Sequence, residues 1–161
     1  IAIIAILASI LFVSIGQVPL QRARDAVRIA DIDQLQLALE LSAQSNNGAY
    51  PSSGGTWRCL GYSPAQTCWI GSYTGLDSLN SALLQYMSKI PLDPRNKAGC
   101  YGDTFLYNSN HPSIGGRPAG TYMHWYFETG PQNDTSCGKG FYGAANSCGP
   151  YCWLYVGPPT P

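Results

Sequence analysis

Residues 1–15, which read IAIIAILASILFVSI, set the architecture expected of this chain because they are apolar on every side of a helix. A charged, amphipathic stretch from Gln21 to about Asn47 follows them with no obvious loop in between. One helix of about 45 residues would be roughly 65–70 Å long. The remaining ~115 residues can form a globule only about 35 Å across. We therefore expect an apolar rod that projects from a small head and that needs a membrane or neighbouring rods to bury it.

The amphipathic stretch carries two apolar stripes at helical spacing. One stripe consists of Ile29, Ile32, Leu35 and Leu39, and the other of Ala23, Ala26, Val27, Ala30, Leu37, Ala38 and Leu41. We expect one stripe to pack on the head and the other to contact neighbouring chains, and the alternative is a single wide stripe that faces the core. Asn46-Asn47-Gly48 predicts the end of the helix, since Asn and Gly tolerate the left-handed conformation.

Gly16 and Pro19 mark the junction between the apolar run and the charged stretch. Pro19 lacks a backbone N–H and crowds the carbonyl of Ile15, and Gly16 is a poor helix former, so we predict a helix break here. We expect the apolar run to be a retained anchor, because no basic region and no small-residue cleavage site of a signal peptide are visible. The run spans about 23 Å against a bilayer core of about 30 Å, so some six to nine further apolar residues are expected upstream.

The composition argues for an exported, disulfide-stabilised head. Charged residues are few and balanced, with nine basic and nine acidic side chains, which gives no indication of a nucleic-acid partner. Six cysteines lie outside the helical part, namely Cys59, Cys68, Cys100, Cys137, Cys148 and Cys152. Six cysteines allow 15 pairings, and we favour Cys59–Cys68 because these two are close in sequence. A metal site is disfavoured, because Cys148 and Cys152 lack a second well-spaced pair and neither histidine has a zinc-like spacing.

The rest of the sequence predicts a small antiparallel sheet. Residues 52–75 resemble a loop, and Leu76, Leu79, Leu83 and Met87 are spaced for a short helix that ends before Pro91. Strands are predicted at 101–107, 121–128 and 151–156, with loops at 108–120 and 129–150. In the second strand, Met123, Trp125 and Phe127 are expected to form the buried face. The fold class is therefore α+β: a long N-terminal helix (residues 1–49) packed on a disulfide-stabilised sheet head (residues 50–161).

No motif in the sequence points to an enzyme or to a bound cofactor. The GxGxxG pattern from Gly138 to Gly143 lies in a predicted loop with no helix after it, so it does not indicate a dinucleotide site. His111 and His124 have no recognisable nucleophile or triad around them. Asn133 begins an N-x-T sequon and is a possible glycosylation site. The many tyrosines and tryptophans fit either a carbohydrate-binding patch or, as we favour, the core and a subunit interface.

Several segments of the chain resemble those of a known family. Residues 1–8, which residues 24–32 and 35–41 continue, resemble the interior of the N-terminal helix of the type IV pilins and of the pseudopilins of type II secretion. Asn47-Gly48-Ala49-Tyr50-Pro51 resembles the family's helix exit, and Ile90-Pro91-Leu92-Asp93-Pro94 resembles a motif before its sheet. Residues 122–126 and 152–154 are similar to pilin-like proteins of small-genome environmental bacteria. The resemblance is specific over about the first fifty residues and patchy beyond them.

The resemblance implies a filament subunit that is made as an inner-membrane precursor. A prepilin peptidase would remove a leader and methylate the new N-terminus, and the pilus assembly machinery would then extract the subunit into a helical homopolymer on the cell surface. The residues expected to pack in the filament core are Ile1, Ile3, Ile4, Ile6, Leu7, Ile10, Leu11, Phe12, Val13 and Ile15.

Two alternatives stay open at this point. One is a pseudopilin of a secretion system, whose head often carries a calcium loop, and no clustered acidic loop stands out here. The other is a membrane-anchored carbohydrate-binding or adhesin module that does not polymerise.

Overall fold

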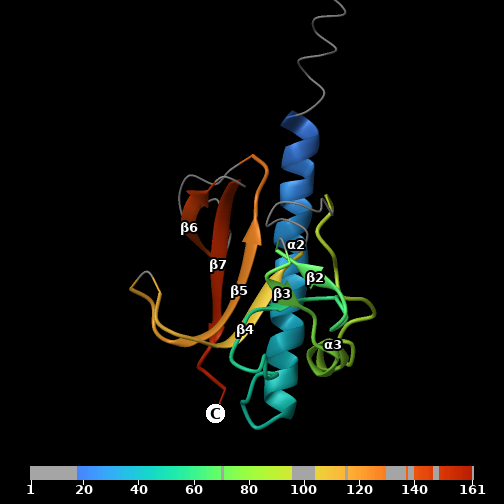
Figure 1. The fold of residues 1–161 in the computed structure, drawn as a ribbon, viewed down its shortest axis with the longest axis vertical. Coiled ribbons are helices and arrows are strands. Elements are labelled where there is room, and N and C mark those ends of the chain that lie inside the picture. The colour runs from blue at the N-terminus through green and yellow to red at the C-terminus, as the bar shows by residue number, and fades with distance from the viewer. Residues whose placement is uncertain are drawn as a thin grey trace, which may run out of the picture.

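A computed structural model describes residues 18–69, 71–95, 104–114, 116–129, 137, 140–146 and 149–160. Helix α2 (Val18–Ser45) packs on one face of a small antiparallel sheet, which is the α+β arrangement expected (Figure 1). The apolar run 1–15 and Gly16 lie outside the described residues, so the predicted core-packing side chains have no structural account here. Within the described ranges, no helix combines the length and the apolar character needed to cross a membrane.

Helix α2 ends where the sequence predicts. Ser45 is its last residue, Asn47 adopts a positive φ of 53°, and the N–H of Gly48 bonds to the carbonyl of Ala43 at 2.8 Å. This left-handed exit satisfies a carbonyl that the helix would otherwise leave without a partner. At the other end, the described part of the helix begins at Val18, and the residues before it lie outside the described ranges. The predicted break at Gly16 and Pro19 therefore stays a prediction.

The sheet has five strands in the order β1-β4-β5-β7-β6, and each neighbouring pair is antiparallel. The strands are β1 (Arg58–Cys59), β4 (Leu106–His111), β5 (Gly120–Tyr126), β6 (Phe141–Asn146) and β7 (Gly149–Gly157). Strand β5 is central, with His124 opposite Trp153 of β7 and opposite Leu106 of β4.

Three sequence predictions about this sheet are wrong in part. The strand predicted at 101–107 begins only at Leu106 and continues to His111, so residues 108–111 are not loop. The loop predicted at 129–150 contains strand β6, which pairs with β7 through a register shift beside Gly143. The region 52–75 holds β1 and a two-stranded ribbon of β2 (Thr67–Cys68) and β3 (Tyr73–Thr74).

The main core lies between helix α2 and the sheet. Ile32, Leu35 and Leu39 are buried, which confirms that one predicted stripe packs on the head. They share a cluster with the predicted sheet face Met123, Trp125 and Phe127, all of which are buried. The short helix α3 (Asp77–Leu83) adds the buried side chains of Leu79 and Leu83 and confirms the predicted short helix.

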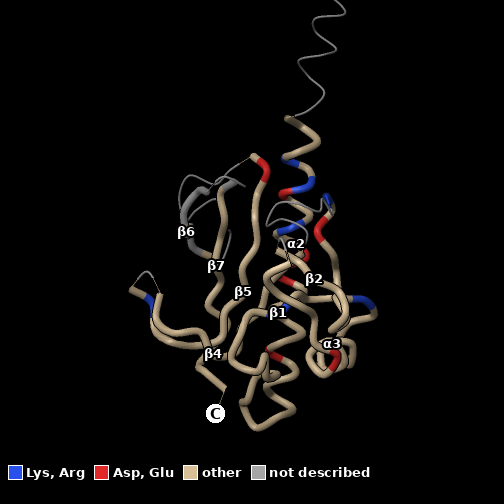
Figure 2. Tube along the Cα trace, viewed as in Figure 1, with Lys and Arg blue, Asp and Glu red and all other residues tan. Residues whose placement is uncertain are grey.

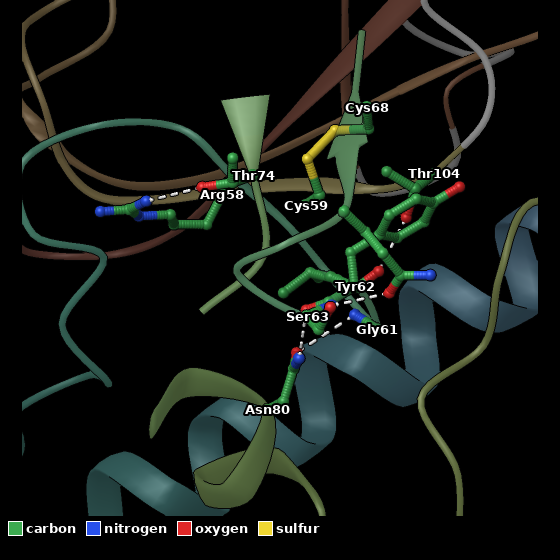
Figure 3. Close-up of a disulfide and its surroundings, with 11 residues drawn as sticks. Arg58, Cys59, Gly61, Tyr62, Ser63, Cys68, Thr74, Asn80 and Thr104 are labelled. Atoms are coloured by element: carbon green, nitrogen blue, oxygen red, sulfur yellow. Dashed lines mark hydrogen bonds between the residues drawn. A yellow bond between two sulfur atoms is a disulfide. The ribbon is translucent and has the colours of Figure 1, made fainter. Parts of the chain in front are cut away.

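Within the described residues, two disulfides fasten the head. Cys59 and Cys68 are joined, as the sequence favoured, with Cα atoms 6.2 Å apart (Figure 3). Cys137 is joined to Cys152 of strand β7, whereas Cys100 and Cys148 lie outside the described residues.

The loop closed by the first disulfide is also tied to helix α3. The side-chain amide of Asn80 accepts from the N–H of Gly61 at 3.1 Å and donates to the carbonyl of Tyr62 at 2.7 Å. A Cβ at Gly75 would overlap the same carbonyl of Tyr62, so the chain can cross here only with glycine. The segment from β1 to β3 is therefore held in one position above the sheet.

Candidate functional site

The side of helix α2 that points away from the head carries an exposed apolar stripe. Val27 and Leu37 remain 47% and 56% exposed, and Leu20 is 60% exposed. We define the outer face of α2 as the uncharged exposed positions on this side, namely Leu20, Ala23, Ala26, Val27, Ala30, Gln34 and Leu37. The exposed charged residues Arg22 and Asp33 border this stripe along one edge. An exposed stripe that contains two leucines and a valine is suited to contact with another apolar surface.

The outer face contains most of the second apolar stripe predicted from the sequence. Ala23, Ala26, Val27, Ala30 and Leu37 are exposed, whereas Ala38 is buried and Leu41 is half-buried. The two stripes therefore do not merge into one wide stripe that faces the core. One packs on the head, and the larger part of the other has no contact with it.

Arg28 is the centre of an ion-pair cluster that joins helix α2 to the head and that includes Arg24, Asp25, Asp93 and Glu128. Its Nε and Nη2 atoms donate to both carboxylate oxygens of Asp93 at 2.6 and 2.7 Å, and Nη1 donates to Asp25 at 2.6 Å. Only 2% of the Arg28 side chain is exposed. Burial alone would lower the pKa of Arg28, but the hydrogen bonds and charges of its carboxylate partners raise it above its ordinary value. The guanidinium therefore stays charged inside the protein.

The cluster extends to the end of strand β5 through Asp25, Arg24 and Glu128. The carboxylate of Asp25 accepts hydrogen bonds from the backbone N–H groups of Glu128 and Thr129, both at 2.9 Å. Arg24 donates two bonds of 2.6 Å to Glu128. The hydrogen bond from Arg24 is the largest influence on Glu128 and, together with Arg28, outweighs burial and lowers the pKa of Glu128 to about 2. Figure 2 shows the charges gathered around the N-terminal half of α2, with few along the strands.

The second candidate site is an aromatic pocket on the sheet face turned away from helix α2. Side chains alternate along β5, so Tyr122, His124 and Tyr126 point away from the face that carries Trp125. They are nonetheless buried, with His124 only 2% exposed. The prediction that Met123, Trp125 and Phe127 form the buried face is confirmed, but the opposite face of β5 is buried as well.

Two groups of residues line this pocket, whose volume is about 330 Å³. His124 and Tyr126 of β5 and Tyr151 and Trp153 of β7 form its floor and one side. The segment from β1 to β3 supplies the remaining side, with Trp57, Trp69 and Tyr73. The Cys59–Cys68 disulfide lies between the two tryptophans in sequence, and Trp69 has a positive φ of 55°. A bulky residue rarely adopts that conformation, so the fold holds Trp69 firmly in place.

The imidazole of His124 is surrounded by rings. Its centroid lies 4.8 Å from that of Trp153, 4.9 Å from that of Trp69 and 4.9 Å from that of Tyr151. Its Nδ1 atom is buried and has no hydrogen-bond partner in the part of the chain that the structure describes. Burial, with a smaller contribution from His111, lowers the pKa of His124 to about 3. The imidazole is therefore neutral at physiological pH.

The other residues singled out from the sequence have different positions. Asn133 lies outside the described residues, as do Gly138 and Lys139 of the GxGxxG pattern. Gly143 of that pattern is in strand β6, where a Cβ would overlap the rings of Tyr151 and Trp153. Its role in the structure is thus to let two pocket rings lie close to the backbone.

Sequence reasoning missed the ion-pair cluster and the grouping of the rings. A signal for the cluster was present, because Arg28 is four residues before Ile32 and seven before Leu35, on the buried stripe. A charge at such a position requires a buried partner, although the sequence does not say that the partner is Asp93. A comparison with models of protein families, with curated proteins and with solved structures finds no match to this chain.

Proposed function

We propose that this chain is a structural subunit that polymerises through its N-terminal helix into a type IV pilus-like filament on the cell surface. The observation that carries the proposal is the outer face of α2. It is an exposed apolar stripe that runs from Leu20 to Leu37, bordered by Arg22 and Asp33, on a helix whose other side is fixed to the head. Copies of the same helix are the partners that would cover such a face along its whole length.

The apolar run 1–15 is the second part of this proposal. Covering its ten large side chains from Ile1 to Ile15 corresponds to a gross free energy of roughly 15–30 kcal/mol per subunit. The inner membrane would cover them in the precursor and neighbouring rods would cover them in the filament. Because each rod would meet a different surface of the next, the contacts repeat without closing and give an open helical polymer.

The ion-pair cluster supports this division of roles. It holds α2 to the 91–95 segment through Asp93 and to the end of β5 through Glu128. Asp93 belongs to the segment that resembles a pilin motif, so that motif packs on the assembly helix in this chain. A subunit that passes force from rod to head needs such a connection, whereas a tethered binding module does not.

The decisive experiment introduces a charge on the outer face and compares it with the same change elsewhere. We expect Leu37→Asp and, separately, Val27→Asp to abolish fibres in sheared cell-surface material viewed by negative-stain microscopy, because a carboxylate would be buried without a partner. Leu84→Asp is the matched control, since Leu84 is 50% exposed on the head, and fibres should persist in that variant.

Each variant is also purified as the full chain in detergent, and its thermal unfolding is compared with that of the wild type. Unchanged unfolding together with lost fibres supports an assembly contact on the outer face. Normal fibre yield in both helix variants would refute the proposal.

A further inference from the structure

The aromatic pocket has the size and the lining of a small-molecule site. Its volume of about 330 Å³ falls within the range of about 300–1,000 Å³ that is common for such sites, which are mostly aromatic or apolar with a few polar groups. It is built from segments far apart in sequence, and a disulfide and a cross-strand pair hold its walls in place. A pocket of this kind exists before any ligand arrives.

The lining excludes ionic ligands. Among the described residues that form it, none is charged at neutral pH, since His124 stays neutral. A phosphate or carboxylate would therefore enter an apolar environment without a counter-charge, which is unfavourable. A quaternary ammonium ion could contact the ring faces, but it has no group that could hydrogen-bond to His124.

The imidazole of His124 restricts the ligand further. It is a polar ring in the wall of the pocket. Its Nδ1 is enclosed by protein, so a ligand in the pocket would reach the imidazole through its other nitrogen, Nε2. A hydroxyl group can donate or accept, so it can pair with a neutral imidazole in either tautomer. A suitable ligand thus combines hydroxyl groups with flat C–H surfaces that pack on the rings of Trp57 and Trp153.

We propose that the aromatic pocket binds a neutral saccharide unit, with its C–H faces against the tryptophan rings and a hydroxyl group hydrogen-bonded to the imidazole of His124. The rings of Trp57 and Trp153 meet at 64° with centroids 5.2 Å apart, so they form a corner rather than a flat platform. A corner encloses one or two sugar rings and does not fit a long chain lying flat. The site is a property of the head and goes beyond the proposed role in assembly.

The test uses the full chain in a polyoxyethylene detergent, whose headgroup contains neither a sugar nor a quaternary amine. Chitotriose, maltotriose, cellotriose and mannotriose are titrated separately while tryptophan fluorescence is followed, because three of the four tryptophans line the pocket. We expect a saturable change with at least one of these sugars and none with tetramethylammonium chloride or sodium phosphate. No saturable change with any of the four sugars, or a response to tetramethylammonium or phosphate alone, would overturn the proposal.

Variants locate the site. His124→Phe keeps an aromatic ring but removes both nitrogens, and we expect it to weaken binding about tenfold, or about 1.4 kcal/mol. Trp57→Ala removes one wall and should weaken binding at least as much. Tyr155→Ala is the matched control, because Tyr155 is an aromatic residue of β7 that is 37% exposed and lies outside the lining. Wild-type affinity in His124→Phe, or an equal loss in Tyr155→Ala, would contradict the assignment.

Thermal unfolding of each variant without sugar shows whether the variant folds. If Trp57→Ala does not fold, the affinity of His124→Phe, which is the smaller change, tests the proposal. The titration measures unassembled chains, so it can fail while the filament proposal stands. The fibre assay on the helix variants can likewise fail without affecting the saccharide site.

Discussion

The two faces of helix α2 differ in an unusual way in its N-terminal half. On the inner face, Asp25 and Arg28 are buried at 6% and 2% exposure, whereas on the outer face Leu20 and Val27 are 60% and 47% exposed. A helix that only had to cover its own head would have no need of large apolar side chains on its outward side or of buried charges on its inward side. The difference indicates that the inner face serves for fixed attachment within one chain. The outer face is suited to contact with another apolar surface.

The largest effect should come from breaking the attachment. Arg28→Ala would leave Asp93 and Asp25 buried without their partner, and such changes cost about 3–5 kcal/mol. We expect a correspondingly lower unfolding temperature of the full chain in detergent. Arg22→Ala is the control, because Arg22 is an exposed arginine of the same helix, and it should change stability by no more than about 0.5 kcal/mol. If both variants lost the same amount of stability, the ion-pair cluster would not be what stabilises the attachment.

A paired leucine truncation tests the two faces directly. Leu35 has no exposed surface, and Leu37 is 56% exposed two residues later. Leu35→Ala should cost about 2–5 kcal/mol because it leaves a cavity in the core. Leu37→Ala should be close to neutral in the unassembled chain, within about 0.5 kcal/mol. Denaturant unfolding of both variants measures the difference, and a large loss in Leu37→Ala would mean that the outer face packs within the same chain.

Acid should weaken the attachment by a smaller amount. The folded-state pKa of Glu128 is about 2, below its ordinary value of 4.5. Below about pH 4.5 the unfolded chain therefore binds a proton that the folded chain does not. The stabilisation is fully present above pH 4.5 and is lost as the pH falls towards 2, by at most about 1.4 kcal/mol per pH unit.

The Glu128→Gln variant isolates this contribution, since glutamine does not titrate. Its unfolding temperature should fall less than that of the wild type between pH 4.5 and pH 2.5. Parallel curves for the two proteins would mean that Glu128 has no depressed pKa in the folded state.

Local sequence patterns were enough to predict helix α2. The spacing of Ile32, Leu35 and Leu39 identified the inner face, and Asn47 and Gly48 marked the helix end, because both features depend on residues within one or two turns. The Cys59–Cys68 pair was predictable for the same reason, as it closes a short loop. The alternation around Trp125 likewise identified β5 and the face that meets the helix.

Features that depend on distant parts of the chain were not predictable. Strand β6 was placed in a loop because the stretch around Gly143, Ala144 and Ala145 has little strand preference by itself, and its pairing with β7 forms the strand. Arg28 and Asp93 are 65 residues apart. The pocket needs Trp57 and Trp153 in contact with each other, and no local pattern relates them. The composition showed that aromatic residues are numerous, but the sequence did not show how they are arranged.

The attachments of helix α2 also determine how the chain, in the filament that we propose, would carry a mechanical load. Near its start the helix is bound to the sheet through Arg24 and Glu128, and just beyond its end the hydroxyl of Tyr50 donates to the carbonyl of Val156 at 3.0 Å. A pull along the helix axis would stretch both attachments at once instead of peeling them apart one after the other. Tension on the rod would thus reach the middle of the sheet, through β5 and β7, without first unwinding an edge strand.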